Sequence, residues 1–223
     1  MSVNLRGVVR DFVFGMEDGL VSNLGLVLGV YVGGGSASVI ILAGLASMFA
    51  GAFSMSAGSY LSAKSQREVY EAEIKAAERE VKKNPLKHLT EMSVLLRKEG
   101  FDKKEVDVIC THFARHNQKT FAKNYIQKKV GLFKRRFDLP WQNAITMFFS
   151  FLAGSAFPIV PFILFTGMEA AVIATVLTII TLFTVGVAKT RYTGRAWYTS
   201  CLEVVLVGLG AGIIGYVVGL LVG

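Results

Sequence analysis

Residues 17–30, EDGLVSNLGLVLGV, place two adjacent carboxylates at the front of a segment that is otherwise apolar enough to cross a membrane. A bilayer core about 30 Å thick requires roughly 20 apolar residues in a helix. Including this segment, the sequence has five such runs, at about 12–33, 38–60, 143–165, 168–188 and 197–222. The first run carries acids and lacks a small-residue cleavage site, so we interpret it as a retained helix rather than a signal peptide.

Positive charge is concentrated in one part of the chain. Residues 61–138 hold 19 Lys and Arg against 11 Asp and Glu, whereas the rest of the chain holds five of each. Basic residues flank the spans on one side only, which is the cytosolic side by the positive-inside rule. The pattern predicts five crossings, with the N-terminus cytosolic and the C-terminus outside. Because the same rule explains the basic segment, we do not expect nucleic-acid binding.

The predicted fold class is an all-α integral membrane protein with five transmembrane helices and a helical cytosolic domain between helices 2 and 3. Residues 1–60 are expected to form transmembrane helices 1 and 2, residues 61–138 the cytosolic domain, and residues 139–223 transmembrane helices 3 to 5. The protein contacts the lipid bilayer along all five spans.

The cytosolic domain is expected to contain three helices. The second span continues without Gly or Pro to about Asn84-Pro85, so it should form one long helix. A second helix covers about 86–99. A third begins at Asp102, whose side chain can cap it, and runs to about Phe121 or beyond.

Acidic residues inside the predicted spans are candidates for function, because an ionisable group is costly in a bilayer. Asp18, next to Glu17, lies about 10 Å into the first span from the cytosolic face, at 1.5 Å per residue. Met55 and Glu203 each lie about six residues from that same face. A carboxylate binds metal ions or protons, and a thioether favours transition metals. The alternatives are a headgroup contact for Glu17, a helix cap for Asp18 and packing for Met55.

Glycines recur every four residues in the first and last spans. This spacing lets helices approach closely, either within one subunit or between subunits. The residues concerned are Gly25, Gly29 and Gly33 in the first span, and Gly215, Gly219 and Gly223 in the last.

Three stretches are similar to motifs of one known family. GMEDGLVSNLGLVLGV at 15–30 resembles the first-helix motif of the vacuolar iron transporter family, whose core is Asp-Gly-Leu before a Gly-rich run. GLASMFAGAFSMSAGSYLSAKSQRE at 44–68 resembles its second-helix motif, and FPIVPF at 157–162 resembles its Pro-x-x-Pro stretch. The resemblance extends over nearly the whole chain.

The resemblance implies a homodimer that exports Fe²⁺ or Mn²⁺ from the cytosol in exchange for protons, and a transporter rather than an enzyme. The metal ion is then a transported substrate, and no cofactor is expected. By their motifs, Asp18 and Met55 match residues that line the family's translocation path, and Glu17 and Glu203 would add charge beside them. Glu80 and Glu91 match acids of a cytosolic metal-gathering domain, where His88 replaces a third acid; we include His88 among the candidate metal ligands.

Departures from the family's pattern suggest alternatives. Ser59 and Lys129 stand where the family has Glu, and Tyr125 stands in place of a Met. A charged lysine cannot ligate a cation. One alternative is therefore a transport-inactive membrane protein whose helical domain binds a partner or anionic lipid. Another is a metal sensor or buffer that the spans only anchor. The short termini favour a prokaryotic cell membrane, or the vacuolar membrane in a eukaryote.

Overall fold

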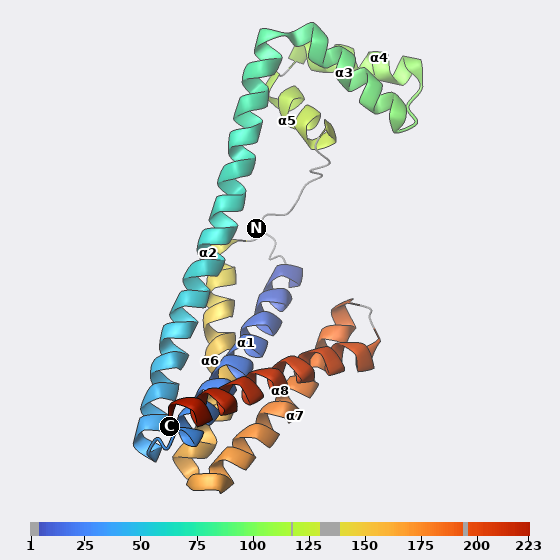
Figure 1. Ribbon diagram of the computed structural model, residues 1–223. Coiled ribbons are helices and arrows are strands. Elements are labelled where there is room, and N and C mark those ends of the chain that lie inside the picture. The colour runs from blue at the N-terminus through green and yellow to red at the C-terminus, as the bar shows by residue number, and fades with distance from the viewer. Residues whose placement is uncertain (1–4, 117, 130–138, 194–195) are drawn as a thin grey trace. The chain divides into compact units, whose positions relative to one another are not determined.

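The computed structural model describes residues 5–116, 118–129, 139–193 and 196–223. These residues form eight helices and no strand. The helices are α1 (Leu5–Val32), α2 (Ala37–Lys83), α3 (Pro85–Lys98), α4 (Lys103–His116), α5 (Gln118–Lys129), α6 (Pro140–Leu164), α7 (Gly167–Thr193) and α8 (Trp197–Val222) (Figure 1). Among them, α1, α2, α6, α7 and α8 are long and apolar enough to cross a membrane. The prediction of an all-α fold with five transmembrane helices is confirmed.

The chain divides into two compact units. The membrane unit comprises Met1–Ala63 and Asp138–Gly223, and the polar helical unit comprises Lys64–Phe137. α2 contributes to both, because Ala37–Lys83 is one helix of 47 residues. The predicted continuation of the second span into the polar segment is therefore confirmed. The predicted domain boundary at residue 138 lies outside the described residues.

Within the membrane unit, α1 packs mainly against α6 and α8. The contact between α1 and α8 is made by backbone. A Cβ atom added at Gly215 would lie 2.0 Å from the carbonyl oxygen of Gly25, and one added at Gly219 would lie 2.4 Å from that of Gly29. Moving four residues forward on α1, from Gly25 to Gly29, moves the contact four residues forward on α8, from Gly215 to Gly219. The two helices therefore run in the same direction. The glycine spacing thus serves close approach within one chain.

The contact between α1 and α6 combines small residues with a buried polar bond. A Cβ atom at Gly19 would lie 2.5 Å from the carbonyl oxygen of Phe151. Asn23 is completely buried, and its Nδ2 donates a hydrogen bond of 2.9 Å to Oγ of Ser155. Hydrogen bonds between small polar side chains commonly join membrane helices. They fix α1, which carries Glu17 and Asp18, in one rotation against α6.

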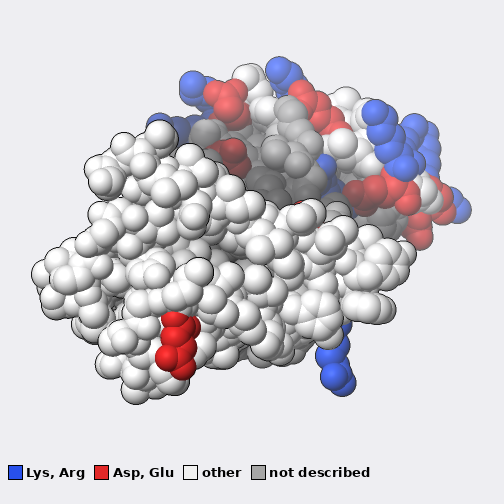
Figure 2. All heavy atoms as spheres, turned by 60° about the horizontal axis from the view of Figure 1, so that its bottom comes forward, with Lys and Arg blue, Asp and Glu red and all other residues white. Residues whose placement is uncertain are grey.

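The membrane part of α2 packs along α6 through side chains. A Cβ atom at Gly51 would meet the Phe151 ring at 2.5 Å, and the rings of Tyr60 and Trp141 lie 5.0 Å apart. Much of α2 is left exposed, including Leu42 and Phe53, at 70% and 71%. In Figure 2 the part of the surface nearest the viewer is almost free of charged side chains. Lipid is the solvent in which such a surface is stable.

The polar helical unit has a side-chain core of its own. The buried residues come from the end of α2 and from α3, α4 and α5, and include Val81, Met92, Leu96, Val106 and Phe121. Met92 is completely buried. The acids and bases of α2 lie on the outside, where Arg67 and Glu71 pair at 2.9 Å. This arrangement is that of a small water-soluble helical domain.

The start of α4 follows the prediction, but its end does not. Asp102 accepts a 2.7 Å hydrogen bond from the backbone N–H of Glu105, and the Glu105 side chain accepts one of 2.8 Å from the N–H of Asp102. This reciprocal pair is a capping box. The third helix was expected to reach about Phe121; instead α4 ends at His116, and Phe121 belongs to α5. A helix-forming composition alone did not reveal that Phe121 belongs to a separate helix and lies in the core.

Candidate functional site

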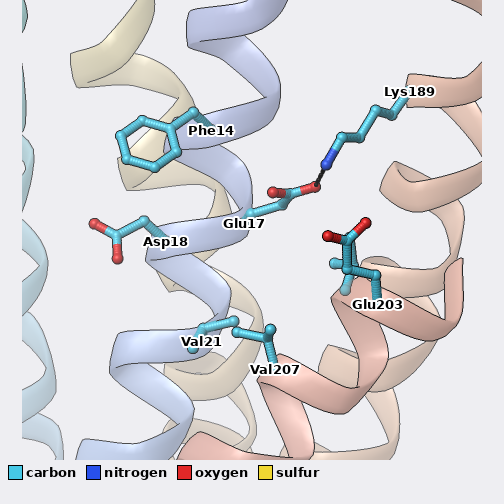
Figure 3. A pocket seen from close by; sticks show the side chains of 8 residues that line it. Phe14, Glu17, Asp18, Val21, Lys189, Glu203 and Val207 are labelled. Carbon is cyan, nitrogen blue, oxygen red and sulfur yellow. Dashed lines mark ion pairs between the residues drawn. The ribbon is translucent and has the colours of Figure 1, made fainter. Parts of the chain in front are cut away.

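A pocket of about 240 Å³ in the membrane unit is lined by residues of three transmembrane helices (Figure 3). The lining residues are Phe14, Glu17, Asp18 and Val21 of α1, Lys189 of α7, and Glu203, Val204 and Val207 of α8. The lining residues of α1 are spaced three or four positions apart, so their Cα–Cβ bonds leave the same face of the helix. The pocket thus combines an apolar wall with three carboxylates and one ammonium group.

The parallel packing of α1 and α8 explains why these acids meet. Gly25 lies against Ala211, and Gly29 lies against Gly215. Continuing the same register two turns back from Gly25 brings Glu17 level with Glu203. At Gly25 and Gly29 the backbones of α1 and α8 touch. Two turns earlier, the longer side chains of Glu17 and Glu203 lie between the same two helices. The glycine contacts between α1 and α8 therefore set the register that brings Glu17 level with Glu203.

Glu17 and Asp18 have different surroundings. Oε1 of Glu17 lies 3.5 Å from Nζ of Lys189, and this oxygen is buried without a hydrogen bond. Glu203 is close enough for its charge to act on Glu17. Figure 3 shows the Glu17 carboxylate directed toward Lys189 and the Asp18 carboxylate directed to the other side of α1. Within the described part of the chain, the Asp18 carboxylate has no hydrogen bond or ion pair.

Three of the four membrane residues predicted for the site line the pocket: Glu17, Asp18 and Glu203. Met55 does not line it; this residue is half-buried on α2, which packs on α6. Its depth was inferred from the sequence, but depth does not fix the direction in which a side chain leaves its helix. The role of Met55 as a ligand remains a prediction.

Lys189 is the lining residue that the sequence interpretation missed. It was counted among the basic residues that set the topology, because it closes an apolar run near Arg191. Its position at the end of the apolar run is the signal that could have identified Lys189. From there a long basic side chain can reach back into the last turns of the span, as such side chains do at membrane interfaces.

Asp11 is a further acid of α1 that was not singled out as a candidate from the sequence. It is 3% exposed, and its Oδ1 lies 2.8 Å from Nη2 of Arg10. Its Oδ2 accepts a hydrogen bond of 3.4 Å from Oγ of Ser59 on α2. Asp11 therefore ties α1 to α2 at the position where the family's Glu is replaced by Ser.

The candidates in the polar helical unit lie in two different environments. His88 is buried, and its Nδ1 lies 3.7 Å from Oε2 of Glu91. The hydroxyl group of Tyr125 donates a hydrogen bond to the Glu91 carboxylate, and the rings of His88 and Tyr125 meet edge to face. Glu80 is exposed and pairs with Lys83 at 3.8 Å. The side chain of Lys129 lies outside the described residues.

None of these groups forms a complete metal centre by itself. Among the described residues, no three His, Cys, Asp or Glu side chains are grouped closely enough to hold one metal ion. The acidic residues that line the pocket therefore do not form a closed ligand shell among the described residues.

Comparison with known proteins identifies the family. The sequence matches the model of the VIT family over residues 9–220. The chain belongs to the VIT family. It is 30% identical to vacuolar iron transporter 1 of Arabidopsis thaliana, over 90% of this chain and 80% of the relative. It is 28% identical to vacuolar iron transporter 1 of Oryza sativa subsp. japonica, over 94% of this chain and 83% of the relative.

Membership of the VIT family confirms several predictions. The resemblance read from the motifs is confirmed, and members of this family are transporters, not enzymes. The relatives are iron transporters, which supports metal transport, and the five helices make the chain an integral membrane protein. The expected prokaryotic cell membrane has no support from these relatives: those named here, and a 25% identical one from Plasmodium falciparum (isolate 3D7), are eukaryotic.

Proposed function

We propose that this VIT-family chain exports divalent transition-metal ions, Fe²⁺ or Mn²⁺, from the cytosol in exchange for protons. The observation that carries the proposal is the pocket between transmembrane helices that three acidic residues line: Glu17, Asp18 and Glu203. Carboxylates in an apolar setting attract a divalent cation strongly. The same groups take up protons when the cation leaves, because burial disfavours uncompensated charge.

In this proposal Asp18 is the residue that binds the ion and exchanges protons. Asp18 lines the pocket, and within the described part of the chain its carboxylate, on the other side of α1 from that of Glu17, is not engaged by another group, so it can turn to a cation. Glu17 and Glu203 supply neighbouring charge. Met55 would contribute a soft thioether at the same depth from α2, as the family motif implies.

The proposed orientation places the N-terminus and the polar helical unit in the cytosol and the C-terminus outside. The parallel course of α1 and α8 agrees with an arrangement in which both enter from the same side. The excess of Lys and Arg in residues 61–138 favours the cytosol for that side. We propose a homodimer as the working unit, with a vacuolar membrane as its location if the chain is eukaryotic.

The polar helical unit would deliver metal ions to the pocket, with Glu80, Glu91 and His88 as its candidate ligands. One observation favours the alternative of a transport-inactive protein that binds a partner or anionic lipid. Glu91 is engaged by Tyr125, and the unit carries most of the basic residues of the chain. A transport measurement separates the two functions.

The test is metal uptake into proteoliposomes that contain a trapped pH dye, with Fe²⁺, Mn²⁺, Co²⁺ and Zn²⁺ offered in turn. The proposal predicts metal-dependent pH change for the native chain. Asp18→Asn should abolish it, whereas Glu169→Gln, which neutralises an exposed acid of α7 outside the pocket, should not. Folded protein without flux of any ion would overturn the proposal and favour the partner-binding alternative.

A further inference from the structure

Lys189 occupies the position that a cation bound to Glu17 would need. Its ammonium group lies 3.5 Å from Oε1 of Glu17, and it lines the same pocket as Asp18 and Glu203. The lysine side chain is 32% exposed and reaches the pocket from the last turns of α7 (Figure 3). A positive charge tethered to the protein therefore stands among the acids of the site.

The contact between Lys189 and Glu17 is held by charge rather than by a directional bond. At 3.5 Å it is longer than the usual 2.7–3.2 Å of an N–H···O hydrogen bond. The Glu17 oxygen is buried, and no other group in the described ranges donates a hydrogen bond to it. An ammonium group on a flexible four-carbon stem can leave such a contact without any movement of the backbone.

A divalent ion and the lysine cannot both neutralise Glu17 well. A small divalent cation binds carboxylate oxygens at about 2.0–2.2 Å, so it would lie within a few ångströms of the ammonium group if the lysine stayed in place. Like charges at that distance repel strongly in a low-dielectric site. Metal entry therefore requires Lys189 to withdraw, and its return favours metal release.

From this geometry we infer that Lys189 is a tethered competitor of the transported ion: it neutralises Glu17 when no metal is bound and lowers the affinity of the pocket for metal. The inference rests on the proposed function and adds a residue that sets affinity and release. Such a competitor would favour release, because carboxylates in a low-dielectric pocket attract a divalent ion strongly.

The inference predicts opposite effects for two substitutions. Lys189→Leu removes the charge without adding a ligand atom, so the KM for Mn²⁺ should fall about fivefold, and kcat should fall because release is slower. Lys189→Arg keeps the charge and adds a planar fork that pairs with carboxylates more firmly. Its KM should therefore rise. A residue with a merely structural role would not move KM in opposite directions.

The experiment measures initial rates of Mn²⁺ uptake into proteoliposomes against Mn²⁺ concentration, together with equilibrium Mn²⁺ binding in detergent. Arg191→Leu is the matched control, because it removes the same charge two residues away from an exposed side chain outside the pocket. That control should leave KM unchanged. Folding of each variant is checked by its elution from a size-exclusion column.

The outcomes separate the inference from the proposed function. If the native chain transports Mn²⁺ and both Lys189 variants leave KM and binding unchanged, or shift them in the same direction, the inference is wrong and the proposed function stands. If Lys189→Leu does not fold, Lys189→Arg decides: a KM at or below the native value contradicts the inference. If the native chain neither binds nor transports any of the four ions, both fail.

Discussion

The two units of this chain handle charge in opposite ways. In the polar helical unit, acids such as Glu71 and Glu80 lie on the surface and pair with basic neighbours on the same helix. In the membrane unit, Glu17, Asp18 and Glu203 come from two helices and line one pocket. Exposed ion pairs contribute little to stability, whereas a charge inside a membrane is costly. The acids with the highest energetic cost, those inside the membrane unit, are therefore the ones at the candidate site.

The units also differ in how their helices are held together. α1 and α8 touch through backbone at glycines, whereas the polar helical unit surrounds Met92 and Leu96 with apolar side chains. Between membrane helices there is no water to expel, so close packing and hydrogen bonds replace the hydrophobic effect. In the polar unit burial from water is the main driving force. Substitutions at the glycine contacts and in the side-chain core should therefore affect the two units separately.

Gly215→Leu should have the largest effect, because any side chain there collides with the backbone of Gly25, 2.0 Å from the new Cβ. The two helices cannot separate without opening the membrane unit, so we expect loss of folded protein. Gly210→Leu is the control: it lies on the same helix and meets nothing within 4 Å. Recovery of monodisperse protein in size-exclusion chromatography measures both. Equal recovery would contradict the backbone contact.

Met92→Ala should open the polar helical unit alone. Met92 is completely buried, so the cavity should cost about 2–5 kcal/mol of unfolding free energy in that unit. Hydrogen exchange should accelerate in residues 64–129 and stay unchanged in α1 and α8. Val94→Ala, at a side chain that is 48% exposed, is the control. Faster exchange throughout the membrane helices would show that the units are not independent in stability.

Tyr125→Phe should have a smaller effect on the same unit. It removes the hydroxyl group that donates to Glu91 and keeps the ring that packs on His88. We expect a loss of about 1–2 kcal/mol, measured by hydrogen exchange in α3 and α5. The freed carboxylate should then bind Mn²⁺ more readily if Glu91 takes part in metal loading. Tyr198→Phe, at a side chain that is 62% exposed, is the control.

The smallest expected effect is on the reactivity of the Cys110 thiol, which reports on packing in the polar helical unit. Burial, and secondarily the charge of Asp107, raises the pKa of the Cys110 thiol above its ordinary value of 9.0. A raised pKa leaves less thiolate at any pH below it, so thiol labelling in a Cys201→Ala background should be slower than for free cysteine. The labelling rate should still rise with pH beyond 9.0. Unfolding should restore the ordinary rate; a fast reaction in the folded protein would contradict the packing.

The membrane spans could be predicted from the sequence for a physical reason. A backbone inside lipid must satisfy its own hydrogen bonds, so long apolar runs become helices whatever surrounds them. The acids Glu17, Asp18 and Glu203 were assigned to one depth by counting residues from the span ends, and the pocket brings them together. Depth follows from the rise of a helix and needs no knowledge of its neighbours.

What the sequence did not predict depends on rotation and on tertiary packing. Met55 was assigned to the depth of the site by counting residues, but α2 packs on α6 and Met55 does not line the pocket. Lys189 was interpreted as a topology signal, because the reach of a long side chain is not visible in charge counts. Phe121 belongs to α5 rather than to the helix that begins at Lys103, and its place in the core depends on tertiary packing, which local helix propensity does not encode.

The most direct test of the account compares the two kinds of acid in one transport assay. Metal-dependent proton flux is measured in proteoliposomes for the native chain, for Asp18→Asn in the pocket, and for Glu80→Gln on the polar surface. The account predicts that Asp18→Asn lowers flux at least about 100-fold, as loss of an essential charged ligand does, whereas Glu80→Gln changes it only a few-fold. Flux that survives in Asp18→Asn would contradict the assignment of the pocket as the transport site.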